Sequence, residues 1–509
     1  MPKLWVRAYE SGVPPEIDYP AVPLPQMLFD TTRRFPDRPA LIYYGRVICY
    51  QELEDLANAF ANALIGLGVA KGDRVAVMLP NLPQCVIAFY GALKAGAIVV
   101  PTNPLYVERE LEFQLTDAGC DTLIALDLFL PRIRAVLPKT GLKRVILTGA
   151  GDFLPRVKRW LFPLQALFSG QSATTPSDPP YYRFCRLIAH SETTQPVVPV
   201  LPHETALLQY TGGTTGTPKG VMLSHANLVA NTVQCRHWMP SLRTGAEVFM
   251  GVVPYFHVYG MTTCMNLAVL IGGAQVLLPR FSTTEVLRAL ARYRCTLFMG
   301  VQAMYVAINS HAEVRRYDLS SIRICISGAG PLHQEVQDQF EALTRGKLVE
   351  GYGLTEAAPV THCNPINGRR KKGSIGLPFP DTDARIVDLD SGARELAIGE
   401  AGELVVRGPQ VMQGYLKRPD ETHGVLRDGW LHTGDIARMD ADGYFQIVDR
   451  KKDMIKTRGE NVYPREVEEV LFRHPKVKEA VVVGVPDAFS VERIKAYVVL
   501  REGVEASAD

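Results

Sequence analysis

The 509 residues of this chain are enough for about three domain-sized units. Hydrophobic residues make up 47% of the sequence and charged residues 21%, which excludes an extended disordered chain and is typical of globular proteins. Because 55 Lys and Arg residues nearly balance 53 Asp and Glu residues, the formal net charge is only +2, and no basic field indicates nucleic-acid binding.

The N-terminus and the cysteines both favour a cytoplasmic protein. The first residues, MPKLWVR, contain no apolar signal segment. The nine cysteines are odd in number and none belongs to a CxxC pair, so the spacing of a zinc site or a disulfide framework is missing. We therefore expect them to be small buried apolar side chains in a reducing compartment.

The first 130 residues of the chain alternate helical and extended patterns. Apolar residues at helical spacing predict a helix over 53–64, and a second helix is expected at about 84–94. Short β-branched runs predict strands at 74–79 and 97–100, and the same alternation returns at 282–330. Strands that alternate with helices in this way predict βαβ units, mostly parallel sheets and an α/β fold.

Two segments resemble membrane-associated sequences. The stretch 248–279 contains no Asp, Glu, Lys or Arg and is long enough to span a bilayer. Pro254 and the pair Gly272–Gly273 interrupt it, so we expect a buried strand, loop, helix and strand instead. The segment 156–168, which precedes a linker at 170–203, combines Lys and Arg with Trp and Phe; it fits either a peripheral contact with an anionic membrane or a flap that packs its own aromatic side chains.

The pattern of predicted secondary structure changes in the last quarter of the chain. Short strands and turns from about 383 to 448 predict a small β-rich subdomain. Five consecutive charged residues at 449–453 precede a new α+β pattern, and we place a domain boundary there. The expected organisation is a large N-terminal domain at 1–448 and a small α+β C-terminal domain at 449–509.

The strongest motif is the run YTGGTTGTPKG at 210–220. Its glycines allow backbone N–H groups to approach an anion, its threonines supply hydroxyl groups, and Lys219 adds a positive charge. This combination suits a polyphosphate. Pro218 precedes the lysine and Gly220 follows it, which differs from a Walker A loop and argues against a P-loop kinase or ATPase.

This run resembles the phosphate-binding loop of the acyl-adenylate-forming superfamily, which includes acyl-CoA synthetases, luciferases and peptide-synthetase adenylation domains. Further motifs of the superfamily have counterparts in the same order: VPYFHVYG at 253–260, SGAGPL at 327–332, GYGLTE at 351–356, DGWLHTGD at 428–435 and DRKKDMIK at 449–456. The sequence around 210, 355 and 459–464 is most similar to bacterial long-chain fatty-acid–CoA ligases. The resemblance implies a small, mobile C-terminal domain that moves over a large ATP- and acyl-binding domain.

The implied reaction has two halves. A fatty carboxylate attacks the α-phosphate of ATP in the presence of Mg²⁺, which releases pyrophosphate and leaves an acyl-adenylate. The thiol of the co-substrate coenzyme A then displaces AMP and forms the acyl-CoA. No covalent enzyme intermediate is needed, which agrees with the lack of a Ser/His/Asp or Cys/His signature.

The resemblance assigns roles to individual residues. Tyr352 would lie against adenine, Thr355 would bind the α-phosphate, and Asp435 with Arg450 would hold the ribose. Glu356 would bind Mg²⁺. The predicted catalytic residues are Glu356, Thr355, His257, Lys219 and Lys456, and the predicted metal ligands are Glu356 and Thr211. The predicted nucleotide and coenzyme A contacts are Thr211, Gly212, Gly213, Thr214, Thr215, Gly216, Lys219, Gly328, Glu350, Gly351, Tyr352, Thr355, Asp435, Arg450, Lys452 and Gly459.

The remaining roles concern the acyl site and the domain movement. By resemblance, His257 lies at the mouth of the acyl site and orients the carboxylate, and the small residues around Gly328 let an acyl chain pass close to the backbone. Lys452 aligns with the hinge, and Gly459 would border the channel for the pantetheine arm. Lys456 would face the active site in one of the two domain orientations.

The C-terminal domain is shorter than is usual in the superfamily, and we expect a truncated domain. The near-terminal lysine of superfamily members has no counterpart before Asp509. Two hypotheses follow. In the first, the protein is an acyl-CoA ligase in the form of a shortened chain, or one in which Lys456 takes over the role of the near-terminal lysine. In the second, it is an ATP- and acyl-binding protein with only weak adenylation activity. An aryl- or medium-chain acid–CoA ligase is a further alternative, because it would share these motifs. The sequence leaves the acyl chain length and the oligomeric state open.

Overall fold

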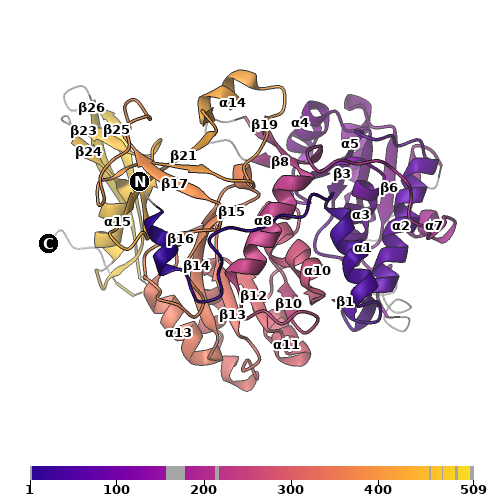
Figure 1. Cartoon of the computed structure of the whole chain (residues 1–509), viewed down its shortest axis with the longest axis horizontal. Coiled ribbons are helices and arrows are strands. Elements are labelled where there is room, and N and C mark those ends of the chain that lie inside the picture. The colour runs from indigo at the N-terminus through magenta and orange to yellow at the C-terminus, as the bar shows by residue number, and fades with distance from the viewer. Residues whose placement is uncertain are drawn as a thin grey trace.

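The computed structural model describes residues 3–155, 178–211, 217–457, 460–472, 474–487, 491–501 and 503–504. Four sheets and the helices that cover them make up this part of the chain, with α1 to α7 at one end of the molecule and the C-terminal strands at the other, while the N-terminus itself lies at the end of the C-terminal strands (Figure 1). The segment 156–168, for which the sequence allows a membrane contact, lies outside the described residues. No helix in the described part of the chain has the length and apolar character needed to span a bilayer.

The largest sheet has nine strands, and its central strands are parallel, as the sequence predicts. Antiparallel strands flank this core at both edges. In spatial order the strands are β16 (Leu377–Pro378), β15 (Val360–Cys363), β14 (Lys347–Gly353), β13 (Ile324–Ser327), β12 (Leu297–Gly300), β10 (Val248–Gly251), β11 (Ala274–Leu277), β1 (Pro39–Tyr43) and β2 (Arg46–Cys49).

The second sheet has eight strands and is likewise mainly parallel. The hairpin that brackets the phosphate-loop motif forms its antiparallel end. In spatial order the strands are β19 (Gly414–Tyr415), β9 (Lys219–Ser224), β8 (Thr205–Thr211), β4 (Ile98–Pro101), β3 (Arg74–Met78), β5 (Thr122–Leu126), β6 (Arg144–Thr148) and β7 (Tyr181–Arg183).

Helices pack between and around these two sheets (Figure 1). The α-helices up to the β-rich region are α1 (Pro25–Arg34), α2 (Tyr50–Gly66), α3 (Pro83–Lys94), α4 (Glu108–Ala118), α5 (Leu130–Val136), α7 (Phe184–Ala189), α8 (His225–Trp238), α9 (Val258–Gly260), α10 (Leu267–Ile271), α11 (Thr283–Tyr293), α12 (Gln302–Asn309) and α13 (Gln334–Thr344). Single turns of 3-10 helix lie at Leu4–Ala8, Asp127–Phe129, Leu137–Lys139, Val314–Arg316 and Thr355–Ala357, and a π-helical turn at Met261–Asn266 joins α9 to α10.

The charge-free stretch is core, as expected from its prolines and glycines. It forms β10, the helical segment from α9 to α10, and β11, and most of its side chains are buried. All nine cysteines fall within the described residues, none of them forms a disulfide bond, and seven of them are buried. The predicted strands and helix near residues 74 to 100 are also present as β3, α3 and β4.

Helix α8 lies between the two large sheets and positions one wall of the site (Figure 1). Ser224 caps it: its hydroxyl accepts a hydrogen bond from the backbone N–H of Asn227, and the Asn227 side chain accepts one from the backbone N–H of Ser224. The buried Asn231 side chain donates to the carbonyl of Val360 at 2.7 Å and accepts from its N–H at 2.9 Å. These paired hydrogen bonds attach α8 to β15. They also satisfy the buried amide, whose polar atoms would otherwise lack hydrogen-bond partners.

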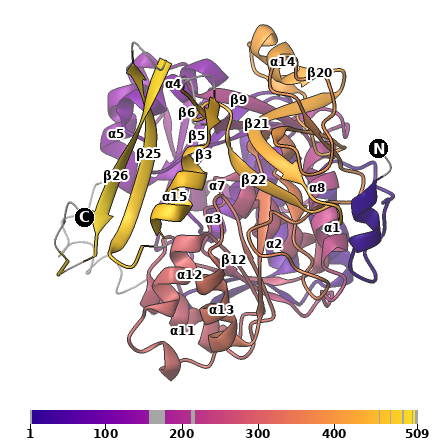
Figure 2. The ribbon, with the colours of Figure 1, turned by 90° about the vertical axis from the view of Figure 1, so that its left-hand side faces the viewer.

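The β-rich region and the C-terminal domain complete the chain. The antiparallel subdomain contains β17 (Asp383–Val387), β18 (Gly402–Arg407), α14 (Pro419–Val425), β20 (Leu426–Arg427), β21 (Trp430–Met439) and β22 (Phe445–Arg450). The C-terminal domain contains β23 (Ile455–Thr457), β24 (Glu460–Val462), α15 (Pro464–Phe472), β25 (Val477–Asp487) and β26 (Val491–Leu500). Figure 2 shows α15 beside the long strands β25 and β26. Strand β22 continues to Arg450, so the antiparallel sheet includes the first two residues of the charged junction, beyond the boundary expected after residue 448.

Candidate functional site

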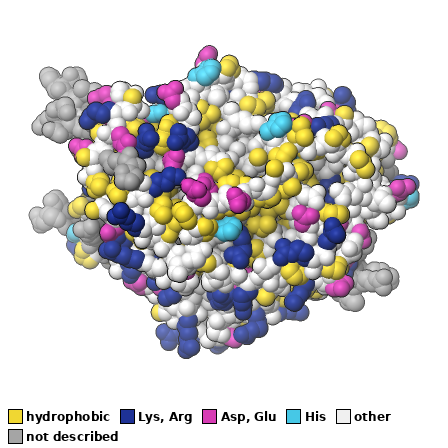
Figure 3. Space-filling model, viewed as in Figure 1, with side chains coloured by type: hydrophobic (Ala, Val, Ile, Leu, Met, Phe, Trp, Pro, Cys, Tyr) yellow, Lys and Arg dark blue, Asp and Glu magenta, His cyan; other side chains and the backbone are white. Residues whose placement is uncertain are grey.

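A cavity of about 970 Å³ lies where the nine-stranded sheet, the β8–β9 hairpin and the antiparallel subdomain meet. Its size is at the upper end of the range for small-molecule sites. In the space-filling view, apolar side chains gather near the middle of one face, with acidic, basic and histidine side chains beside them (Figure 3). The residues that line the cavity likewise divide into a polar part and an apolar part.

Most of the residues predicted from the sequence meet in this cavity. Its lining includes Thr211, Lys219, His257, Gly328, Glu350, Gly351, Tyr352, Thr355, Glu356, Asp435, Arg450 and Lys452. The predicted residues Gly212, Gly213, Thr214, Thr215, Gly216 and Gly459 lie outside the described part of the chain, and so does the side chain of Lys456.

The carboxyl edge of the nine-stranded sheet explains why distant residues converge. Strand β13 ends immediately before Gly328, and β14 carries Glu350 and Tyr352 toward the turn at Thr355–Ala357. Parallel strands place their carboxyl ends at one edge, where α/β sheets bind ligands. Gly353 is needed for this path, because a Cβ atom there would lie 2.1 Å from the carbonyl oxygen of Pro359.

Tyr352, Asp435 and Arg450 form a connected group. The Tyr352 hydroxyl donates a hydrogen bond of 2.5 Å to Oδ2 of Asp435, and Nε of Arg450 lies 3.6 Å from Oδ1 of the same carboxylate. Burial raises the pKa of Asp435 and that of Tyr352 above their usual values. The three residues that the resemblance assigns to adenosine are therefore joined through one carboxylate.

Glu356 is held by a residue that the sequence did not reveal. Tyr415 of β19 donates a hydrogen bond of 2.8 Å to Oε1 of Glu356, and the N–H of Met412 donates to the backbone carbonyl of Glu356 at 2.8 Å. Both Glu356 and Thr211 line the cavity. The described residues contain no cluster of three or more His, Cys, Asp or Glu side chains suited to a metal ion, but Mg²⁺ typically takes one or two carboxylates together with substrate phosphates and water. The carboxylate of Glu356 and the hydroxyl of Thr211 are oxygen ligands that fit such a magnesium site.

Lys219 lies at the start of β9, opposite Thr211 in the β8–β9 ladder. Its ammonium group forms an ion pair with Glu421 of α14 and lies 5.0 Å from the centre of the Tyr415 ring. The side chain is 19% exposed. The positive charge is thus held at the cavity wall by an anion and an aromatic face.

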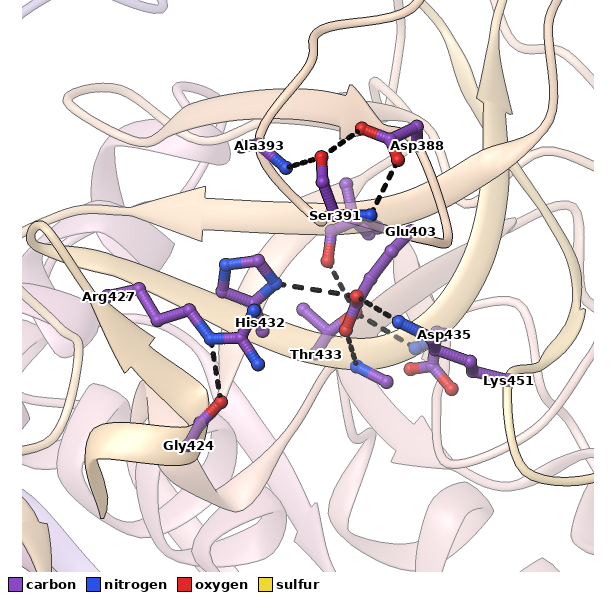
Figure 4. A network of polar contacts seen from close by, with 12 residues as sticks. Asp388, Ser391, Ala393, Glu403, Gly424, Arg427, His432, Thr433, Asp435 and Lys451 are labelled. Carbon is purple, nitrogen blue, oxygen red and sulfur yellow. Dashed lines mark hydrogen bonds and ion pairs between the residues drawn. The ribbon is translucent and has the colours of Figure 1, made fainter. Parts of the chain in front are cut away.

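Glu403 is the centre of a polar network next to Asp435 (Figure 4). Its carboxylate, 6% exposed, accepts hydrogen bonds from Nζ of Lys451 at 2.9 Å and from the N–H of Gly434 at 3.2 Å, and Nδ1 of His432 lies 3.4 Å away. The N–H of Lys451 also donates to the carbonyl of Gly434 at 2.9 Å. Two hydrogen bonds therefore hold Lys451, the residue before Lys452, against β18 and β21.

Glu350 is a buried carboxyl group in the wall of the cavity. Burial raises its pKa to about 7, although the N–H of Leu332 donates to its Oε2 at 3.3 Å. A carboxyl with this pKa changes protonation state near neutral pH. Such groups occur often at functional sites.

The apolar part of the cavity lies between α8 and the β14–β15 edge. Cys235, Trp238 and Met239 line it from the helix side, and Val360 and Cys363 line it from β15. Trp238 is held in place, since its Nε1 donates to a backbone carbonyl at 3.2 Å and its ring packs against a phenylalanine ring 4.9 Å away. This lining can accommodate a hydrocarbon chain.

The mouth of the apolar part is bordered by His257 and Gly328. Burial lowers the pKa of His257, so its imidazole is mainly neutral at pH 7. A Cβ atom at Gly328 would lie 3.1 Å from the ring of Tyr259. Glycine therefore keeps space free where the polar and apolar parts meet.

Tyr415, Glu421 and Glu403 were missed because their roles arise from distant contacts. Tyr415 is separated by 59 positions from Glu356, and it becomes a neighbour only when the short strand β19 pairs with β9. No local spacing or composition signals these pairings. In the sequence, these contacts are indicated only by the Gly-Tyr pair of β19 and the acidic residues that follow at the start of α14.

Comparisons with known proteins agree with this geometry. The AMP-binding enzyme family matches residues 28–416, and the AMP-binding enzyme C-terminal domain matches residues 466–509. A long-chain-fatty-acid–CoA ligase from Bacillus subtilis (strain 168) is 46% identical across 100% of this chain and 90% of its own length. The crystal structure of ATP-bound MatB from Rhodopseudomonas palustris has 29% identity and a TM-score of 0.83, covering 96% of this chain and 90% of that one. A long-chain-fatty-acid–CoA ligase structure from Archaeoglobus fulgidus has 27% identity and a TM-score of 0.75, covering 97% of this chain and 93% of that one.

Proposed function

The chain belongs to the AMP-binding enzyme family, and we propose that it activates long-chain fatty acids with ATP and transfers the acyl group to coenzyme A. The observation that carries this proposal is the shared cavity. An apolar pocket against α8 opens directly into the polar wall that contains Thr355, Glu356 and Asp435. A carboxylate with a hydrocarbon tail can therefore place its head beside the nucleotide while its tail is removed from water.

In the first half-reaction, a carboxylate oxygen forms a bond to the α-phosphorus of ATP, and the bond to the pyrophosphate oxygen breaks. Lys219 binds the terminal phosphates as a point charge, and Thr355 donates to the α-phosphate. Negative charge grows on the departing pyrophosphate, so a preorganised cation at this position lowers the barrier. Glu356 and Thr211 would hold Mg²⁺, which supplies charge neutralisation on the phosphates.

In the second half-reaction, the thiol of coenzyme A loses its proton to solvent, its sulfur bonds to the acyl carbon, and AMP leaves with the electron pair of the acyl–oxygen bond of the mixed anhydride. Asp435 and Arg450 retain the ribose of AMP through both steps. Lys452 lies at the point where the C-terminal domain begins, and movement at such a junction brings different residues to the site. Lys456 and Gly459 are proposed to contribute from that domain.

The test is a substrate panel of long-chain, medium-chain and aryl acids, with separate detection of pyrophosphate and of the coenzyme A thioester. We expect the highest kcat/KM with long-chain acids. Pyrophosphate release without a thioester would restrict the function to adenylation, and no acid-dependent release would favour a binding protein. A preference for aryl acids would contradict the long-chain assignment.

Glu356→Gln provides the matched test of the site. This variant keeps the shape of the side chain and removes its charge, so we expect loss of most Mg²⁺-dependent pyrophosphate release with an unchanged melting temperature. Glu108→Gln, an exposed carboxylate at the start of α4, serves as the control and should retain activity. Full turnover of Glu356→Gln would contradict the role of Glu356 in magnesium binding.

A peripheral contact of segment 156–168 with anionic membranes belongs to the same proposal, because it would bring the enzyme to its lipid substrate. Support comes only from its basic and aromatic residues. Co-sedimentation with anionic liposomes should fall when Trp160 and Phe162 are both replaced by Asp. Equal co-sedimentation would exclude this contact.

A further inference from the structure

Helix α14 connects two residues of the proposed triphosphate site. It follows β19, which pairs with β9 beside the phosphate-loop hairpin. The hydroxyl of Thr422 in α14 accepts a hydrogen bond of 2.9 Å from the N–H of Tyr415. Tyr415 in turn donates to Glu356 and lies beneath the ammonium group of Lys219. The position of α14 is therefore coupled to both the carboxylate and the cation of the site.

Glu421 on this helix forms the ion pair with Lys219. The hydrogen bond from Lys219 lowers the pKa of the Glu421 carboxyl, so this group is ionised at neutral pH. Arg418, one turn earlier, lies 3.4 Å from the other carboxylate oxygen. The two side chains of the ion pair are 19% and 36% exposed, and Lys219 lines the cavity, so a phosphate in the cavity can reach its ammonium group.

A lysine ammonium group has three donors but only one unit of charge. The terminal phosphates of ATP carry several negative charges and would bind the same ammonium group of Lys219 that now pairs with Glu421. AMP, which lacks the β- and γ-phosphates, would leave the pair undisturbed. Glu421 and the terminal phosphates are thus alternative partners of Lys219.

We propose that Glu421 is a resident anion that competes with the terminal phosphates for Lys219. ATP must displace the carboxylate when it binds, and the carboxylate stays nearby because α14 is anchored through the hydrogen bond between Tyr415 and Thr422. After adenylation, the carboxylate returns to Lys219 and promotes release of pyrophosphate. This inference rests on the proposed role of Lys219 as a phosphate ligand.

The test compares Glu421→Gln with the wild type by calorimetric titration of Mg·ATP, pyrophosphate with Mg²⁺, and AMP. Partly exposed ion pairs contribute modestly, so we expect Mg·ATP and pyrophosphate to bind about threefold to fivefold more tightly to the variant. AMP affinity should not change. Product inhibition by pyrophosphate should increase by the same factor, which a purely structural role of Glu421 would not produce.

Asp420→Asn is the matched control, because it removes an exposed carboxylate from the adjacent position of α14. Tighter binding of ATP to Asp420→Asn as well would overturn the proposal, since it would reduce the effect to net charge. Unchanged or weaker ATP and pyrophosphate binding to a folded Glu421→Gln would also overturn it. If the wild type itself failed to bind Mg·ATP, the proposed function would fail first, and that result is distinguishable because it appears before any variant is compared.

Discussion

Tyr415→Phe removes one hydroxyl group from the site and keeps the aromatic ring next to Lys219. The lost hydrogen bond, 2.8 Å long, ends on the Glu356 carboxylate. Hydrogen bonds to charged groups contribute about 1.5–3 kcal/mol, and we take the lower end because Glu356 is only half-buried. About 1.5 kcal/mol corresponds to roughly a tenfold lower rate when the loss is felt in the transition state.

The assay is acid-dependent pyrophosphate release measured over a series of Mg²⁺ concentrations. We expect Tyr415→Phe to need more Mg²⁺ for half-maximal rate and to show a kcat/KM about tenfold lower. Tyr181→Phe, on the outer strand β7, is the matched control and should behave as the wild type. A folded Tyr415→Phe with normal turnover and normal Mg²⁺ dependence would refute the reasoning that this hydroxyl orients Glu356.

Three further changes test other parts of the structure. Asp435→Asn weakens the acceptor of the Tyr352 hydroxyl and the proposed ribose contact, so the KM for ATP in steady-state assays should rise about tenfold; an unchanged KM would exclude the ribose role. Burial raises the pKa of Glu350 to about 7, above its unfolded value of about 4.3, so the folded state binds this proton more tightly. The contribution of Glu350 to stability is therefore fully present below about pH 4.3 and is lost as the pH rises to about 7, and Glu350→Gln should remove this contribution from a plot of Tm against pH; parallel plots for the two proteins would contradict the assignment. Glu54→Ala leaves the buried Lys94 ammonium, now 2.6 Å from Glu54, without its counter-ion, which should cost about 3–5 kcal/mol of unfolding free energy; a loss below about 1 kcal/mol in denaturant titrations would be inconsistent with a buried ion pair.

The α/β core was predictable because its signals are local. The strands at Arg74–Met78 and Ile98–Pro101 are short β-branched runs, and the helix at Pro83–Lys94 separates them by the length that a parallel crossover needs. The charge-free stretch could likewise be assigned to the core, because its prolines and glycines break any long helix. In each case the information lies within about thirty consecutive residues.

From the sequence, only those residues of the site that belong to recognisable motifs could be predicted. Glu356 and Asp435 were found through their motifs, and both line the cavity. Their partners were not found, since the Tyr415–Glu356 bond and the Lys219–Glu421 ion pair connect segments that are far apart in the sequence. A contact of this kind depends on how two sheets pack, and neither periodicity nor composition of either segment encodes it.

The Glu403 network has a mechanical consequence for the second half-reaction. The Lys451 side chain is bound to Glu403, and its N–H is bound to the carbonyl of Gly434, the residue directly before Asp435. Rotation of the C-terminal domain at Lys452 leaves both bonds intact, because they lie on the N-terminal side of that residue. If the C-terminal domain pivots at Lys452 as proposed, the proposed ribose contact of Asp435 would therefore keep its geometry, and AMP would stay in place as the leaving group for the thiol. A pivot one residue earlier would break the hydrogen bonds of Lys451, so these bonds favour the proposed pivot at Lys452 over one at Lys451.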